Sequence, residues 1–367
     1  MAESPTKDAQ SQDLDIPLSA TFIPPSITRP LLSSSTSYTH HSPHPPILTS
    51  SDDRPPCILG VDEAGRGPVL GPMVYAVAYT PLNSSHFLKS HSFDDSKKLT
   101  ASFRSQLFHS TCTPSHDLHT HVGWSCTLLS ARDISSGMLR PNTVGAYNLN
   151  AQAHDTTARL IREVIESGVN VAEIYVDTVG VATSYQAKLQ KQFPGAKVTV
   201  AKKADSLYPI VSAASVVAKV TRDAAIEVLA EMEQEEEEKV EEDPEANGED
   251  QNEAEKVEPA EDGKQKGKRT WDKVVEMGSG YPGDDKTKKW LKSNMDPVFG
   301  FGNRAVRFSW RTVADMMDGK GANAVGVEWE EDVDDGDQRI TGFFTSGDSV
   351  GAGNGSWYGV PVKADSF

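Results

Sequence analysis

The sequence predicts a mixed α/β fold for the central part of the chain. Residues 57–62 and 73–80 are apolar, rich in strand-forming side chains and close together, which favours an antiparallel hairpin. Three further strand patterns, over residues 123–129, 173–177 and 197–201, alternate with segments of helical spacing. A hairpin followed by strand–helix alternation is typical of a mixed sheet flanked by helices.

The predicted helices lie between these strands and after the last of them. Residues 145–167 have helical apolar spacing and end before Gly168, a residue type that commonly terminates helices. A second helix, over residues 212–220, is rich in small side chains. Residues 281–317 also have a helical pattern, and we expect them to form a small second lobe that closes over the functional site.

The end of the first strand carries two adjacent carboxylates, in the run GVDEAGRGP at residues 60–68. Asp62 and Glu63 follow an apolar strand, where ionised carboxylates are unfavourable unless they are paired or bind a metal ion. The pair therefore indicates a metal-dependent phosphate site. The alternative is a tight turn with solvated charges.

A glycine–arginine–glycine turn follows this acidic pair. Gly65 and Gly67 have no Cβ, so they permit unusual backbone angles and the close approach of a ligand to the main chain. Arg66 between them offers a forked set of donors to a phosphate.

Two more acidic residues lie at the ends of predicted elements. Asp177 ends the strand at residues 173–177, and Asp205 precedes the helix at residues 212–220. Four carboxylates that converge from element ends suit Mg²⁺ or Mn²⁺, because these cations prefer oxygen ligands. Two such ions can stabilise the attacking and leaving oxygens of a phosphodiester.

Several motifs, in order along the chain, resemble those of the catalytic A subunit of eukaryotic type 2 ribonuclease H. They are VDEAGRG at 61–67, DSK at 95–97, YNLN at 147–150, VDTVG at 176–180, KAD at 203–205, SAAS at 212–215 with RD at 222–223, and GSGYP at 278–282. The resemblance spans residues 57–315 apart from one acidic insertion. It implies the ribonuclease H fold, with a five-stranded mixed sheet flanked by helices and a small C-terminal helical lobe.

The resemblance assigns roles to particular residues. The catalytic, metal-binding carboxylates match Asp62, Glu63, Asp177 and Asp205, with two Mg²⁺ or Mn²⁺ ions expected when substrate is bound. The backbone clamp for a ribose 2′-hydroxyl matches Gly65, Arg66 and Gly67, and the tyrosine that packs on the deoxyribose after a ribonucleotide matches Tyr281. The positions near the nucleic-acid backbone match Lys97, Asn148 and Arg222, each of which also suits a surface or capping role.

These roles imply an endoribonuclease that hydrolyses the RNA strand of RNA–DNA hybrids. It would also cut 5′ of single ribonucleotides in duplex DNA, leaving a 3′-hydroxyl and a 5′-phosphate. The resemblance further implies two accessory subunits in a heterotrimer and a role in ribonucleotide removal during DNA replication and repair. One alternative is another nuclease of this fold, against which residues 65–67 and Tyr281 argue. The other is a non-catalytic hybrid-binding scaffold, against which the four carboxylates argue.

Charge is distributed unevenly along the chain, whose formal net charge is −17. Residues 231–262 contain 17 acidic residues and two lysines, so the central part outside them is modestly basic, which suits binding to a phosphate backbone. The predicted organisation is a disordered Ser/Thr/Pro-rich extension at 1–54, a catalytic core at 55–230, an acidic low-complexity insertion at 231–268, a helical lobe at 269–319 and an acidic, glycine-rich tail at 320–367, disordered or bound by a partner.

No apolar run is long enough to span a bilayer and the first residues lack an apolar signal core, so we expect a soluble intracellular protein that does not engage membranes. A short basic string at residues 264–269 favours the nucleus, with the cytoplasm as a second compartment. The spacing of Cys112 from the histidines at 116, 119 and 121 matches no common zinc pattern. His154 is expected at a helix surface.

Overall fold

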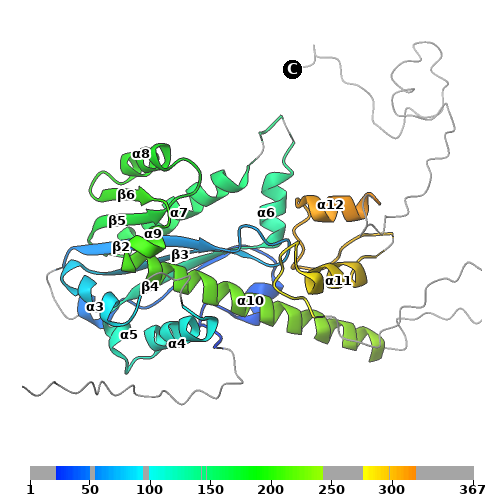
Figure 1. Ribbon diagram of the computed structural model, residues 1–367, viewed down its shortest axis with the longest axis horizontal. Coiled ribbons are helices and arrows are strands. Elements are labelled where there is room, and N and C mark those ends of the chain that lie inside the picture. Colours follow the sequence, from blue (N-terminus) through cyan, green and yellow to red (C-terminus); the bar gives the residue numbers. More distant parts are fainter. Residues whose placement is uncertain are drawn as a thin grey trace, which may run out of the picture. The chain divides into compact units, whose positions relative to one another are not determined.

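The computed structural model describes residues 22–49, 54–93, 99–141, 143–145, 147–242, 276–296 and 298–319. A mixed β-sheet forms the centre of this part of the chain. Six strands occur in these ranges, in the order β1-β4-β3-β2-β5-β6 (Figure 1). Their bounds are Tyr38–His41 (β1), Cys57–Ala64 (β2), Met73–Pro81 (β3), Gly123–Leu129 (β4), Val171–Asp177 (β5) and Lys197–Ala201 (β6). The mixed α/β class and the strands β2 to β6 are confirmed, whereas β1 is an addition to the five predicted strands.

Helices cover both faces of this sheet (Figure 1). On one face α10, Pro209–Glu242, contacts β2 and β3, and α4, Ala101–Cys112, packs against α10. On the other face lie α7, Leu149–Glu166, and α8, Ala182–Gln192. Shorter elements connect these parts: α2 (Pro46–Thr49), η1 (Leu82–Ser84), α3 (Ser85–Ser90), α5 (Asp117–His121), α6 (Ala131–Met138) and α9 (Ala204–Leu207).

β2 lies at the centre of the sheet, between an antiparallel and a parallel neighbour. It pairs antiparallel with β3 and parallel with β5, and all its residues except Glu63 are buried. A Cβ at Gly60 would lie only 2.4 Å from the carbonyl carbon and oxygen of Ile210, so a side chain there would push α10 away. Glycine in mid-strand therefore lets the first turns of α10 lie directly against β2.

Residues 22–49 differ from the expected disordered extension, because they form α1, Arg29–Ser33, the strand β1 and α2. β1 pairs antiparallel with β4, and Ile27 and Leu32 are buried in the core that α10 shares with the sheet. The expectation is wrong for this segment because two apolar anchors and an edge strand suffice to hold it on the sheet. Residues 1–21 and 50–53 lie outside the described residues.

The predicted boundary at residue 230 is also wrong, because α10 continues to Glu242. The acidic residues of this extension are paired with arginines from distant parts of the chain. Arg29 contacts Glu231 at 3.0 Å and Glu235 at 2.8 Å, and Arg304 contacts Glu236 at 2.8 Å. The opening of the acidic segment is thus part of a helix, while the rest of the insertion, residues 243–268, lies outside the described residues.

The C-terminal lobe contains two helices, α11, Asp285–Ser293, and α12, Arg311–Met317. The segment between them is largely non-helical, so the helical pattern over residues 281–317 is only partly realised. An antiparallel bridge joins Leu70 to Val306, and Gly71 N–H donates to Ala305 O at 2.7 Å. The lobe is therefore hydrogen-bonded to the segment that leads from β2 to β3.

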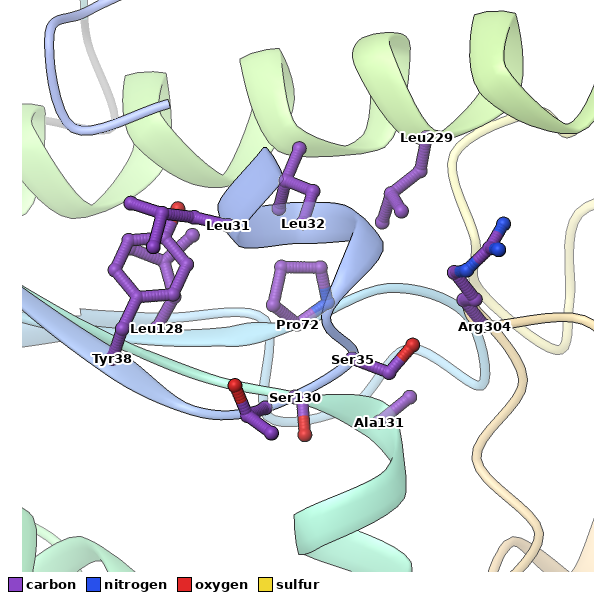
Figure 2. Close-up of a pocket in the computed structure, with 11 residues that line it drawn as sticks. Leu31, Leu32, Ser35, Tyr38, Pro72, Leu128, Ser130, Ala131, Leu229 and Arg304 are labelled. Atoms are coloured by element: carbon purple, nitrogen blue, oxygen red, sulfur yellow. The ribbon is translucent and has the colours of Figure 1, made fainter. Parts of the chain in front are cut away.

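A small pocket lies where α1, α10, the sheet and the C-terminal lobe come together (Figure 2). In Figure 2, Leu229 points from α10 toward the space beside Leu32 and Pro72, and Arg304 lies at one side. None of the four predicted carboxylates lines this pocket. Across the described ranges, we find no helix with the length and apolar character needed to cross a membrane.

Candidate active site

The predicted carboxylates gather at the carboxyl end of the central parallel strands. Asp62 and Asp177 directly follow Val61 and Val176, which face each other on β2 and β5. Asp205 lies in α9, which begins soon after β6. The N–H of Ala204, the first residue of α9, donates to Asp177 Oδ1 at 2.9 Å and ties this short helix to the end of β5.

Burial and mutual repulsion act on these carboxylates together. Asp62 and Asp205 are only 6% and 4% exposed. Burial raises the pKa of Asp62 above its usual range and the charge of Asp177 raises it further, while a hydrogen bond with Ser215 and the charge of Lys219 act in the opposite direction. Burial, followed by the charge of Asp62, likewise raises the pKa of Glu63. Crowded oxygen ligands of this kind favour a hard divalent cation, because its charge offsets both burial and repulsion.

The carboxylates nevertheless do not form a closed cage in this structure. Among the described residues, no group of three or more His, Cys, Asp or Glu side chains is arranged so that it could hold a metal ion. Backbone hydrogen bonds contribute to this arrangement: Asp62 Oδ1 accepts from Glu63 N–H at 2.8 Å, and Asp177 Oδ1 accepts from Ala204 N–H. The assignment of the four ligands therefore stays a prediction.

The glycine–arginine–glycine turn packs against Tyr281. A Cβ on Gly67 would lie 3.2 Å from Tyr281 Cε1, and Gly65 has a φ of +84°, which disfavours any side chain at that position. Tyr281 is 47% exposed, so its ring offers a free surface beside the main chain of the turn. The structure thus brings together two motifs that lie more than 200 residues apart in the sequence.

The C-terminal lobe holds this turn in place. Gly280 O accepts hydrogen bonds from Val69 N–H at 2.7 Å and Leu70 N–H at 3.2 Å. Trp310 Nε1 donates to Gly67 O at 3.1 Å. The buried Arg307 donates from Nε to Gly71 O at 2.8 Å.

Three predicted nucleic-acid contacts have different outcomes. The Arg222 side chain is 10% exposed, donates to Ser279 O at 2.8 Å and lies 5.7 Å from the Tyr281 ring centroid, so it supports the tyrosine from within the protein. Asn148 is the N-cap of α7, and its Oδ1 accepts from the N–H groups of Asn150 and Ala151. Lys97 lies outside the described residues.

Several residues to which the sequence analysis assigns no role contact the predicted site. Ser215 and Lys219, four residues apart on α10, both act on Asp62, and this spacing places them on one helix face. Arg66 donates to Asn150 Oδ1 at 2.8 Å and to Tyr75 Oη at 3.3 Å. His154 is a partly exposed residue of α7, consistent with its expected place at the helix surface, and it also stacks on Tyr185 with ring centroids 4.0 Å apart.

A mixed sheet flanked by helices, with acidic residues near the ends of β2 and β5 and at the start of α9, matches the ribonuclease H fold. The sequence profile of the family described as Ribonuclease HII matches residues 59–243. The chain belongs to this ribonuclease HII family and is a ribonuclease H.

Related proteins cover most of the chain. It is 45% identical to the A subunit of ribonuclease H2 from Neurospora crassa, over 94% of this chain and 97% of that protein. It is 42% identical to the corresponding A subunit from Schizosaccharomyces pombe, over 93% of this chain and 89% of that protein. The crystal structure of ribonuclease H2 from Pyrococcus horikoshii superposes with a TM-score of 0.50 at 27% identity, covering 71% of this chain and 96% of that one.

Proposed function

We propose that this chain is the catalytic subunit of a type 2 ribonuclease H that cuts RNA–DNA hybrids and also cuts 5′ of single ribonucleotides in duplex DNA. The observation that carries this proposal is the packing of Tyr281 against Gly67, so close that a Cβ added to Gly67 would lie only 3.2 Å from Tyr281 Cε1. It supports a site that contacts a ribose and the sugar that follows it at the same time.

Recognition of a ribose requires a contact with its 2′-hydroxyl, because this group distinguishes RNA from DNA at a single position. The glycine turn suits this role, since its main chain is not shielded by side chains at residues 65 and 67. The hydrogen bond from Trp310 to Gly67 O and those from Val69 and Leu70 to Gly280 O hold the turn and the tyrosine loop in register. A rigid turn of this kind costs little reorganisation when a ribonucleotide binds.

Asp62, Glu63, Asp177 and Asp205 are the residues that would hold Mg²⁺ or Mn²⁺. The all-oxygen donor chemistry of these four residues, and the raised pKa values of Asp62 and Glu63, fit a hard cation. When bound, two such ions supply charge neutralisation at the phosphate and activation of water. The chain itself holds Asp62 through Ser215 and Lys219 and fixes Asp177 through the N–H of Ala204, which keeps the carboxylates at one end of the sheet.

The two fungal relatives are each named as one lettered subunit of ribonuclease H2, which supports an assembly with other subunits. We propose that there are two of these and that the complex acts in the nucleus during DNA replication and repair. The basic string at residues 264–269 supports this compartment, and it lies outside the described residues.

The decisive test uses one duplex with a single ribonucleotide and a matched all-DNA duplex. We expect Mg²⁺-dependent cleavage on the 5′ side of the ribonucleotide, no cleavage of the all-DNA duplex, and no cleavage of either after chelation with EDTA. An Asp177→Asn variant is the inactive control. Tight binding of the hybrid without any cleavage, under conditions that support assembly, would instead establish a binding scaffold.

A further inference from the structure

The first two turns of α7 contact both loops of the proposed site. Asn150 Oδ1 accepts a hydrogen bond from Arg66 Nη2 at 2.8 Å. Asn150 Nδ2 lies 3.6 Å from the place that a Cβ would take on Gly180, in the loop that follows β5. One helix residue therefore lies between the glycine–arginine–glycine turn and the loop after Asp177.

His154 extends this contact on the same face of α7, four residues further along. Its Nε2 lies 3.3 Å from Val179 O, and because a carbonyl oxygen only accepts, Nε2 must carry the proton. The imidazole stacks on the buried Tyr185 with an interplanar angle of 19°, which fixes the ring from the other side. The histidine thus has a defined orientation toward the loop after β5.

These contacts link two loops that are far apart in the sequence and have different roles in the proposed function. The turn at residues 65–67 is the ribose clamp of the proposed function, and the loop at residues 178–180 follows the catalytic Asp177. Arg66 is held from one side by Tyr75 Oη at 3.3 Å and from the other by Asn150. Loss of the asparagine acceptor would leave the guanidinium with only the longer of these two contacts.

We infer that Asn150 and His154 are positioning residues of the nuclease, which hold the ribose clamp and the Asp177 loop on one face of α7. Asn150 acts through Arg66 on selection of the ribose, and His154 acts through Val179 on the placement of Asp177. This inference rests on the proposed function and deepens it. It also separates Asn150 from Asn148, whose side chain caps the helix.

The test of Asn150 compares Asn150→Leu, which keeps the size but removes the acceptor, with Asn150→Asp, which keeps an acceptor oxygen for Arg66. Both are made in the full-length chain, in the assembly in which it is active. The readout is the ratio of affinities for a single-ribonucleotide duplex and the matched all-DNA duplex, measured with Ca²⁺ in place of Mg²⁺. A ratio cancels any general effect of the added charge in Asn150→Asp on binding to phosphates.

We expect Asn150→Leu to lower this ratio roughly threefold to tenfold, as for loss of one charge-assisted hydrogen bond near the surface. Asn150→Asp should stay within about twofold of the parent protein. In an Arg66→Ala background, Asn150→Leu should have no further effect. Arg162→Gln, which removes an exposed contact between α7 and Gln192, is the matched control for a general loss of a helix-surface hydrogen bond.

The outcomes distinguish this inference from the proposed function. A parent protein with no preference for the ribonucleotide duplex refutes the proposed function. A parent protein with that preference, together with an unchanged ratio in Asn150→Leu or an equal loss in Asn150→Asp, refutes the inference alone. Persistence of the Asn150→Leu effect without the Arg66 side chain would also refute it.

His154 is tested with His154→Phe, which keeps a ring for stacking on Tyr185 but loses the donor, and with His154→Gln, which keeps a donor. We expect kcat on both cleavable substrates to fall at least threefold in His154→Phe, with KM and the affinity ratio unchanged. His154→Gln should retain more kcat than His154→Phe. A change confined to KM, or a larger loss in His154→Gln, would overturn the assignment.

Discussion

Replacement of Gly67 by alanine tests whether the contact between the glycine turn and Tyr281 governs substrate choice. The new Cβ would lie 3.2 Å from Tyr281 Cε1, which is tighter than nine in ten real Cβ contacts, so the ring must move by a few tenths of an ångström. Gly67, unlike Gly65, is not among the glycines with positive φ, and its backbone accepts alanine without strain. The half-exposed ring has room to shift.

The expected effects on stability and activity differ for this reason. The free energy of unfolding should change by less than about 0.5 kcal/mol, because the side chain that moves is at the surface. Stacking of an aromatic ring on a nucleotide contributes roughly 1–3 kcal/mol, and a partial displacement should forfeit the lower part of this range. We therefore expect kcat/KM for a single-ribonucleotide duplex to fall about threefold to tenfold, with a smaller loss on a long RNA–DNA hybrid.

Single-turnover cleavage of both substrates by the parent protein, Gly67→Ala, Tyr281→Ala and the double variant measures this coupling. Tyr281→Ala should lose more activity than Gly67→Ala and should also affect the single ribonucleotide most. In the Tyr281→Ala background, the Gly67→Ala change should have little further effect, because there is no ring to displace. Additive losses, or equal losses on the two substrates, would refute the reasoning.

Three other predictions concern the carboxylates, the N-terminal segment and the insertion. Asp62→Asn should abolish cleavage and keep hybrid binding. In EDTA at pH 7, this variant should also have a free energy of unfolding roughly 1–4 kcal/mol higher than the parent protein. The reason is that the raised pKa of Asp62 makes the parent protein lose stability as pH rises from about 4 to 7. An unchanged free energy of unfolding in Asp62→Asn would show that burial of the ionised carboxylate does not destabilise the parent protein. Leu32→Ala should lower the free energy of unfolding by roughly 2–3 kcal/mol, while Ile23→Ala, at an exposed position, should have almost no effect. Both free energies are measured by chemical denaturation. Negligible changes in both variants would place residues 22–49 outside the folded unit. Replacing residues 243–268 by a short Gly/Ser linker should preserve single-turnover cleavage and tighten substrate binding at low salt, a gain that fades near physiological ionic strength. A replacement that begins at residue 235 should also lower the melting temperature, because it removes Glu235 and Glu236, which pair with Arg29 and Arg304. Loss of cleavage with the shorter replacement would make the insertion structural.

The sequence alone predicted the central strands and named the four carboxylates as candidate ligands. Strands β2 to β6 have local apolar patterns, and each pattern is a property of a few consecutive residues. Asp62 and Asp177 end such patterns on strands that prove to be parallel neighbours. Because both residues lie near the carboxyl ends of their strands, local motifs were enough to predict that they lie close together.

The tertiary structure decided what depends on partners distant in the sequence. Residues 38–41 form a strand because they pair with the edge of β4, more than 80 residues away. Their local sequence pattern does not predict a strand. The composition of the acidic residues at the end of α10 predicted a solvated, disordered segment. In the structure, Glu231 and Glu235 form ion pairs with Arg29, and Glu236 forms one with Arg304. Glutamate has high helix propensity, so pairing with distant cations turns an acidic run into a helix.

The roles of the two asparagines of the YNLN motif show the same division. Both are polar and exposed, and the sequence analysis named only Asn148 as a candidate for the site. The start of α7 makes Asn148 the cap, while Asn150 faces Arg66. The chemistry of a side chain is written in the sequence, but the direction in which it points depends on helix phase and on packing between elements distant in the chain, and this is why only the folded structure assigns its role.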